Sequence, residues 1–342
     1  MGGFQRETSH ASANGDVAPP AAVHTLVMAG SPGDLAARLA PCVLRAVEDG
    51  EAVHVNLTTT RGGALRRRLG AAADAVTWTD TAVWAAHPVR RLREVQRLVD
   101  EQLAGGARLC FVGECAWPVD EPDLWAEWER FDAVLNHALE GRPVTMVCVY
   151  DEEEHSPHSL ERAHACHPYV GVEPPRPAPG YVEPEAFLAL DRADHLEVPA
   201  HAVRLSGALV PGTVRAQLGA LLFGTGGLAP LGLGGAMDED VADALLVTTT
   251  ELVTNAWQAA AAVVDVACWR DGAWAVVQVD DDGPGLTDPL AGYRRPPVDA
   301  LGGRGLWITR QLADTVDIAA GDWGTSVRLR LRVQPLEVTA RA

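Results

Sequence analysis

The sequence predicts an α/β protein of two domains, and three of its features lead to that prediction. The chain has 342 residues, more than one hydrophobic core usually organises. Short apolar runs alternate with longer segments of helical spacing in the first half. Residues 172–184 are rich in proline, which is typical of a connector between folded units. We expect a flexible tail over 1–21, a front domain over 22–170, a connector over 171–196, a second domain over 197–334 and a tail over 335–342.

The front domain is expected to contain a parallel sheet with helices on both faces. Apolar runs of strand length occur at residues 24–28, 52–57, 75–78, 108–112 and 144–150. Helical spacing of apolar residues occurs at 34–48, 89–103 and 121–139. Strand–helix alternation of this kind predicts parallel pairing through helical crossovers.

The second domain is expected to place helices on one face of a mixed sheet. Helices are predicted over 211–222, 238–262 and 305–313, the second opened by acidic residues that suit its dipole. Asp271-Gly272 separates two apolar runs, 264–270 and 273–279, and is a strong signal for a hairpin. A final hairpin is predicted around 321–332.

Charge and composition exclude several classes of function. The net charge is -18 and no lysine is present, which argues against direct binding of nucleic acid. The short basic run from Arg66 to Arg68 is expected to be a solvated helix face. Without lysine the chain also lacks a complete Walker A phosphate loop.

The cysteines and the hydropathy pattern point to the cytoplasm. Six cysteines are scattered, mostly within apolar runs, and none forms a CxxC pair. No stretch reaches the roughly 18 apolar residues needed to span a bilayer. We therefore expect a cytoplasmic protein with reduced thiols and no membrane partner.

Glu251 and Asn255 stand four residues apart on the long predicted helix and therefore share one face. The carboxylate could accept a proton, and the carboxamide oxygen could bind Mg²⁺, which prefers oxygen ligands. Either residue alone would be ordinary solvated surface.

Two glycine-rich turns follow in the sequence. Asp281 ends a predicted buried strand and opens the run Asp281-Asp282-Gly283-Pro284-Gly285, where a carboxylate could accept a hydrogen bond from an adenine amino group. Gly302-Gly303-Arg304-Gly305 precedes a helix, whose free amides form an anion site. Each turn on its own is a weak signal.

Together these segments resemble the N, G1, G2 and final boxes of the histidine-kinase/Hsp90 ATPase superfamily, and most closely its anti-sigma-factor serine kinases. The boxes are Glu251 to Ala256, Val279 to Gly285, Gly303 to Leu306, and Gly324-Thr325, within residues 200–333. The resemblance implies a Bergerat-type α/β sandwich that binds ATP and Mg²⁺. It implies that Asn255 binds Mg²⁺ and that Glu251 is the general base. It implies that Asp281 accepts a hydrogen bond from the adenine amino group and that Thr325 supports this carboxylate. Gly283 and Gly285 would shape the pocket, and the phosphate-binding segment would consist of Gly303, Arg304, Gly305 and Leu306.

The resemblance implies two partners, a STAS-type anti-sigma antagonist that is phosphorylated on serine and a sigma factor. Gln258 and Ala259 depart from the Arg-His that this kinase family often has there. A non-catalytic, ATP-gated protein-binding switch therefore stays open as the alternative.

A transcription factor is a weaker third hypothesis because no helix-turn-helix is evident. No dimerising helix with a phospho-accepting histidine precedes the module, and His201 is expected to be structural.

The front domain resembles the MEDS sensory domain, named for methanogen, methylotroph and DcmR-type sensors. The matching segments are Gly113 to Trp117, Phe131 to Asn136, Val147 to Asp151, and His167-Pro168. The family implies a RecA-like sheet without a working phosphate loop and an unknown small-molecule signal. Glu114 and Trp117, after a predicted strand, are the sensory-site candidates. The chain is a possible homodimer.

A metal site in the front domain also stays open. Imidazole and thiolate groups suit zinc, copper or iron. Five such residues crowd a short segment: His155, His158, His164, Cys166 and His167. Their spacing matches no standard zinc finger.

Overall fold

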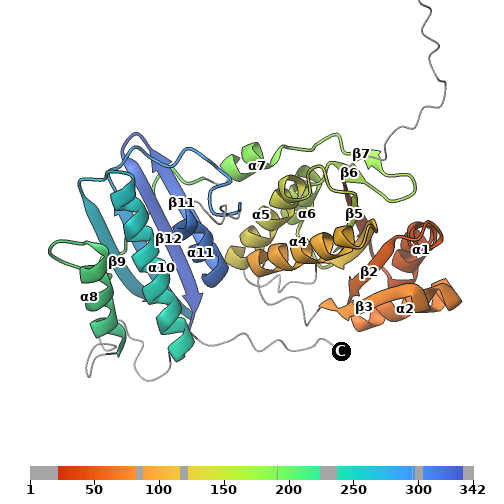
Figure 1. Cartoon of the computed structure of the whole chain (residues 1–342), viewed down its shortest axis with the longest axis horizontal. Coiled ribbons are helices and arrows are strands. Elements are labelled where there is room, and N and C mark those ends of the chain that lie inside the picture. The colour runs from red at the N-terminus through yellow and green to blue at the C-terminus, as the bar shows by residue number, and fades with distance from the viewer. Residues whose placement is uncertain are drawn as a thin grey trace, which may run out of the picture.

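The computed structural model describes residues 22–81, 88–115, 122–190, 192–223, 237–294, 296 and 303–333. It contains two sheets, one of seven strands in the order β3-β2-β4-β5-β1-β6-β7 and one of five in the order β11-β12-β10-β9-β8. Each sheet builds its own lobe, and the lobes lie side by side (Figure 1). Trp117, the second sensory-site candidate, lies outside the described residues.

The first sheet is parallel across its five main strands, as the strand–helix alternation predicts. These strands are β1 (Ala22–Ala29), β2 (Ala52–Leu57), β3 (Val76–Asp80), β4 (Leu109–Glu114) and β5 (Val144–Asp151). β1 pairs with β5 along its whole length, and β4 lies between β5 and β2. The sheet is buried on both faces, which is why its strands are almost continuously apolar.

Helices cover both faces of this sheet. α1 (Pro32–Glu48) and α2 (Thr59–Leu69) enclose one hydrophobic core, with Leu39, Val43 and Leu65 fully buried. α4 (Pro88–Ala104) and α5 (Pro122–Ala138) enclose the other. The predicted three-layer arrangement of the front domain is therefore confirmed.

α2 is not among the helices that apolar spacing predicts, although a helix face is expected at Arg66 to Arg68. The helix contains two glycines and four arginines in eleven residues, so it has little apolar periodicity. Arg66, Arg67 and Arg68 form its exposed face, as expected of a solvated run. The guanidinium of Arg66 lies 4.5 Å above the ring of Trp78, which anchors the helix to β3.

Part of the expected connector is regular and packs on the front domain. β6 (Tyr169–Val170) pairs with β7 (Arg176–Pro177), and α7 (Pro184–Leu190) follows. Phe187 of α7 is fully buried in a cluster with Ala133 and Cys166. Proline suits the first turn of a helix, so Pro184 begins α7 where a break was expected.

The second sheet is antiparallel in all its described pairings, so the expectation of a mixed sheet is wrong. Tight turns join two pairs of its strands in hairpins, and such connections require antiparallel neighbours. Its strands are β8 (Val203–Arg204), β9 (Val264–Asp271), β10 (Trp274–Asp281), β11 (Thr315–Gly321) and β12 (Gly324–Arg332). His201 lies exposed just before β8.

Three helices share one hydrophobic core with this sheet: α8 (Pro211–Phe223), α10 (Glu239–Gln258) and α11 (Arg304–Leu312). α10 is the long helix of the prediction but ends four residues before Ala262. The chain leaves the helical conformation at Ala260, whose φ is 61°. The amides of Ala262 and Val263 donate instead to Asp282 Oδ1, at 2.7 and 2.8 Å. No helix in the described part of the chain is long and apolar enough to cross a membrane.

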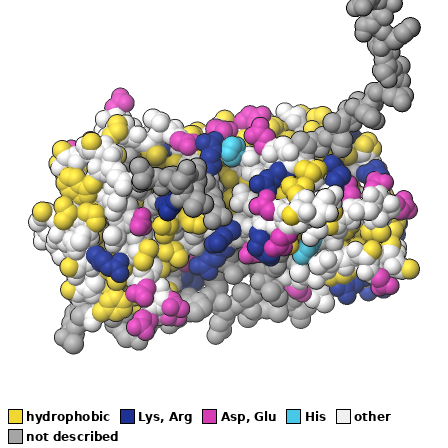
Figure 2. Space-filling view, viewed as in Figure 1, with side chains coloured by type: hydrophobic (Ala, Val, Ile, Leu, Met, Phe, Trp, Pro, Cys, Tyr) yellow, Lys and Arg dark blue, Asp and Glu magenta, His cyan; other side chains and the backbone are white. Residues whose placement is uncertain are grey.

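The two lobes meet where α4 and α5 of the first contact α11 and β11 of the second. Arg130 of α5 donates to Glu127 Oε1 at 2.7 Å and to Asp317 Oδ1 of β11 at 2.9 Å. The amide of Val316 donates to Glu127 Oε1 at 2.8 Å. Blue arginine side chains are visible along this junction in Figure 2.

Candidate functional site

The first and third motifs of the second domain come together in space. Asn255 lies in the last turn of α10, and Gly305 in the first turn of α11. A Cβ added to Gly305 would lie 2.7 Å from both Nδ2 and Oδ1 of Asn255. Only glycine allows this approach, which brings the carboxamide beside the free amides of a helix N-terminus.

Asp281 ends β10 at the same edge of the domain. Its Oδ1 accepts a hydrogen bond from the Gly283 amide at 2.9 Å. Burial raises the pKa of Asp281, while hydrogen bonds from the backbone amides of Gly283 and Thr325 oppose the rise. Asp281 and Thr325 are cross-strand neighbours on β10 and β12. Thr325 therefore contacts the carboxylate through its backbone.

Glycines fit the turns around Asp281 closely. Gly285 has φ +79°, and a Cβ there would lie 2.5 Å from the Gly321 carbonyl oxygen. A Cβ added to Gly283 would lie 2.8 Å from Asp281 Oδ1 and 3.6 Å from Ala259. The turn after β10 thus packs against both the final hairpin and the end of α10.

Gly303 forms the N-cap of α11 in the left-handed conformation, with φ 80°. It is exposed, and a Cβ there would have no neighbour within 4 Å among the described residues. Arg304 is exposed as well, whereas Gly305 and Leu306 are buried, and the positive end of the helix dipole lies at this N-terminus. This is the feature that an anionic ligand requires.

Glu251, Arg304 and Leu306 occupy different environments. Glu251 is half-buried on α10, one turn before Asn255, and Arg304 is exposed at the first position of α11. Leu306 is buried in the core of the second domain, next to Gly292. Its side chain thus packs inward.

Asp282 is a contributor that the sequence analysis did not single out. It accepts from two successive amides beyond α10, and these bonds lower its pKa. It thereby ties the chain after α10 to the turn after β10. The sequence does place Asp282 directly after the candidate Asp281. Its hydrogen-bond partners, however, lie about 20 residues away in sequence.

The residues present fit a nucleotide with a divalent cation. Asp281 offers a carboxylate acceptor at one end, the first turn of α11 offers amides for phosphate oxygens, and Asn255 offers an amide oxygen between α10 and α11. The glycines allow close contacts between these segments that a side chain would block.

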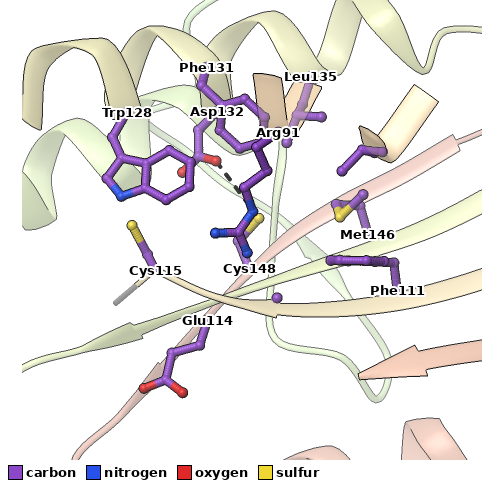
Figure 3. A pocket seen from close by; sticks show the side chains of 12 residues that line it. Arg91, Phe111, Glu114, Cys115, Trp128, Phe131, Asp132, Leu135, Met146 and Cys148 are labelled. Carbon is purple, nitrogen blue, oxygen red and sulfur yellow. Dashed lines mark hydrogen bonds between the residues drawn. The ribbon is translucent and has the colours of Figure 1, made fainter. Parts of the chain in front are cut away.

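In the front domain, Glu114 belongs to a buried network at the carboxyl end of the sheet. Its carboxylate accepts from the Thr58 amide at 2.7 Å and pairs with Arg61, which also pairs with Asp151. Glu114 also borders a small cavity of about 20 Å³, room for about one water molecule. Figure 3 shows this cavity between Arg91, Trp128, Cys115 and Cys148.

The histidine-rich segment does not form one metal site. His158 and His164 are exposed, and His155 Nδ1 bonds to the Asp151 carbonyl oxygen at 2.7 Å. Cys166 Sγ is directed to the Ala163 carbonyl oxygen at 3.4 Å. Among the described residues, only His167 of these five joins a group of candidate ligands, and its companions come from other elements.

Comparisons with known proteins divide the chain in the same way. Residues 23–168 match the family model of the MEDS domain, "MEthanogen/methylotroph, DcmR Sensory domain". Residues 234–331 match that of the "Histidine kinase-like ATPase domain". A search of curated proteins gave no match.

Two solved structures are among those that resemble the chain. One is the histidine kinase domain of the E. coli osmosensor EnvZ, with 19% identity, a TM-score of 0.23, and coverage of 43% of this chain and 94% of that one. The other is the histidine kinase domain of the blue-light activated histidine kinase EL346 from Erythrobacter litoralis, with 16% identity, a TM-score of 0.22, and coverage of 71% and 94%. By the two family models, residues 23–168 form a MEDS sensory domain and residues 234–331 form a histidine kinase-like ATPase domain.

Proposed function

We propose that the protein is a cytoplasmic sensory regulator whose second domain binds ATP with Mg²⁺ and phosphorylates a serine of a STAS-type anti-sigma antagonist. The observation that carries the proposal is the convergence of Asn255, Asp281 and the N-terminus of α11 near the end of α10, through close contacts that glycines allow. The match to the histidine kinase-like ATPase family supports it.

Each residue has a distinct task in this proposal. Asp281 accepts the adenine amino group, the first-turn amides of α11 hold phosphate oxygens, and Asn255 supplies an oxygen ligand to Mg²⁺. When bound, Mg²⁺ neutralises charge on the phosphates. In the transfer, the serine Oγ bonds to the γ-phosphorus, the bond to the bridging oxygen breaks and ADP leaves. Glu251 accepts the serine proton.

The contact between the lobes supports control by the front domain. Leu290 and Tyr293 lie between the second and third motifs in sequence and are buried in the hydrophobic core that α4 and α5 build. Arg310 of α11 lies 3.9 Å above the Tyr293 ring. A signal that moves α5 would therefore shift both the segment after the second motif and the helix α11 that follows the third motif. A sigma factor that binds the second domain is the second partner in this proposal.

A non-catalytic ATP-gated switch is the second candidate, and one observation favours it. Ala259, where the kinase family often has histidine, lies beside Gly283 at the edge of the site. The site therefore has a methyl group where those kinases have an imidazole. In such a switch, ATP changes partner affinity without transfer of phosphate.

Incubation of the full chain with γ-labelled ATP, Mg²⁺ and purified STAS-domain proteins distinguishes the two. The kinase proposal predicts label on serine of one of them, and a drop of about 10²-fold or more in Glu251→Ala with ATP affinity retained. ATP-dependent binding of that protein without label would establish the switch instead.

A further inference from the structure

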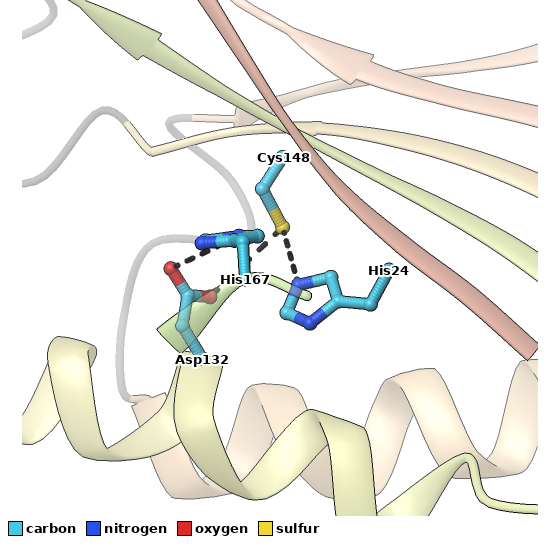
Figure 4. Close-up of side chains that lie close together, drawn as sticks. All are labelled: His24, Asp132, Cys148 and His167. Atoms are coloured by element: carbon cyan, nitrogen blue, oxygen red, sulfur yellow. Dashed lines mark hydrogen bonds and ion pairs between the residues drawn. The ribbon is translucent and has the colours of Figure 1, made fainter. Parts of the chain in front are cut away.

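Four side chains that bind metals in other proteins meet in the core of the front domain. We call them the tetrad; each is at most 7% exposed, and their ligand atoms lie within 4.8 Å of one another. They come from four places in the fold and converge between the sheet and α5 (Figure 4). The tetrad consists of His24 on β1, Asp132 on α5, Cys148 on β5 and His167 after α6 (Pro157–Cys166).

The orientation of His24 is fixed by Asn136. The Asn136 amide nitrogen donates to the carbonyl oxygens of Ala133 and Cys166, at 3.2 and 2.8 Å, so its Oδ1 is the acceptor toward His24. His24 Nδ1, 2.9 Å from that oxygen, must therefore carry the proton. Nε2 is left with a lone pair, which faces Cys148 Sγ at 3.2 Å.

His167 is oriented in the same way by a backbone carbonyl. Its Nδ1 lies 2.6 Å from the Ala163 carbonyl oxygen, which can only accept, so Nδ1 is protonated here too. Nε2 is fully buried, has no hydrogen-bond partner, and lies 4.0 Å from Asp132 Oδ2. A buried lone pair of this kind requires a partner that the side chains around it do not supply.

The other two members suit a cation between them. Cys148 Sγ lies 4.0 Å from Asp132 Oδ1, and Tyr150 donates to Asp132 Oδ2. Burial lowers the pKa of His24 to about 3 and that of His167 to about 4, so both imidazoles are neutral. Burial raises the pKa values of Cys148 and Asp132, and the buried Arg91 guanidinium partly opposes both rises.

We propose that the tetrad binds one divalent transition-metal ion of the zinc class. Zinc takes four ligands tetrahedrally at about 2.0–2.3 Å, which places ligand atoms roughly 3.3–3.7 Å apart, close to the separations here. Two neutral imidazoles, one thiolate and one carboxylate make the loaded site neutral, so no net charge is buried. The bonds from each Nδ1 and from Tyr150 are the outer contacts that hold metal ligands in place.

The site would belong to the sensor itself. Asp132 and Cys148 also line the small cavity described above, so a ligand there would lie beside the metal. Binding replaces the Cys148 S–H proton, which passes to solvent, so affinity should fall with falling pH.

The test uses the full chain, stripped with chelator under reducing conditions and reconstituted with Zn²⁺ or Co²⁺. Mass spectrometry of the metal content should give about one equivalent per chain, and Co²⁺ should give the absorption of a tetrahedral site with a thiolate ligand. Cys148→Ala should abolish the thiolate band and weaken Zn²⁺ binding at least tenfold. Asp132→Asn, which keeps the volume, should weaken binding similarly.

Cys110→Ala is the matched control, because Cys110 is an equally buried thiol of the same sheet in the core on its opposite face. It should keep both the metal and the band. Circular dichroism reports whether each variant folds. If Cys148→Ala does not fold, the proposal is tested by the Co²⁺ absorption band of the wild type and by the metal content of Asp132→Asn. A wild-type chain that binds less than about a tenth of an equivalent, or metal retained undiminished by a folded tetrad variant, would overturn the proposal.

Discussion

Asn255 and Gly305 are in such close contact that a single methyl group on Gly305 would overlap the carboxamide, at 2.7 Å from both of its terminal atoms. This contact joins the end of α10 to the start of α11. It sets the position of the proposed magnesium ligand relative to the proposed phosphate-binding amides. The proposed nucleotide site therefore depends on the absence of a side chain at Gly305.

Gly305→Ala is accordingly expected to weaken MgATP binding. The methyl group must push the carboxamide or the helix aside, and overpacking of this kind costs about 1–3 kcal/mol. A loss of this size in binding corresponds to roughly 5- to 150-fold in affinity. Calorimetric titration checks it, with Gly212→Ala on α8 as control, since a Cβ there meets nothing within 4 Å. Equal affinity in the two variants would contradict the assigned role of the contact.

Asp281→Asn should weaken ATP binding by roughly 10- to 100-fold. Hydrogen bonds to a charged group contribute about 1.5–3 kcal/mol, and an amide can turn a donor toward the adenine amino group. Asp280→Asn is the matched control, because Asp280 is the preceding residue of β10 and accepts from Gln278 and Ser326 instead. If the control loses as much affinity as Asp281→Asn, adenine is read elsewhere.

The affinity for ATP should also depend on pH in a predictable direction. Burial raises the pKa of Asp281, so its carboxylate becomes protonated at a higher pH than an ordinary aspartate. Protonation removes the acceptor for the adenine amino group. Affinity should thus be full above this raised pKa and fall as the pH drops through it, in titrations at constant ionic strength. Asp281→Asn should flatten this part of the profile, and a persistent fall in the variant would assign it to another group.

Arg130→Met should loosen the contact between the lobes. The guanidinium bridges Glu127, which is 2% exposed, to Asp317 of the second domain, and the two carboxylates hold the pKa of Arg130 above its usual value. Removal of one partner from a buried ion pair costs about 3–5 kcal/mol. Hydrogen exchange should show faster exchange in residues 286–294 and 315–318.

The control for this variant is Arg97→Met, whose ion pairs with Glu94 and Glu101 lie on the exposed face of α4. Exchange at the lobe junction should be unchanged there. If Arg130→Met leaves the junction as protected as Arg97→Met does, the ion pairs do not hold the lobes together.

The sequence predicts the framework better than it predicts the sites. Strands such as Leu109–Glu114 are mostly apolar and lie between segments of helical spacing, so their position follows from local periodicity. The nucleotide motifs were recognisable because each is contiguous, as in the run from Asp281 to Gly285. The fixed end of α10 was not predictable, because it depends on the contact of Asp282 with Ala262 and Val263.

The tetrad, in contrast, could not be predicted from local sequence. His24 and Cys148 stand 124 residues apart in sequence and meet only because β1 pairs with β5. Local spacing instead suggested His158 and His164 as metal ligands, and both are exposed in the structure. Residues that are adjacent along a helix or loop can diverge in direction, whereas a parallel sheet brings distant segments into register.

A titration of the full chain with ATP, in the presence and absence of Mg²⁺, tests the central claim most directly. We predict one site per chain, with an affinity that depends on Mg²⁺ in the wild type. Asn255→Ala should lose most of that dependence, while Asp243→Ala, an exposed position on the same helix, should behave as wild type. No binding by the folded wild-type chain, or binding that Asn255→Ala leaves equally strong and equally dependent on Mg²⁺, would contradict the account.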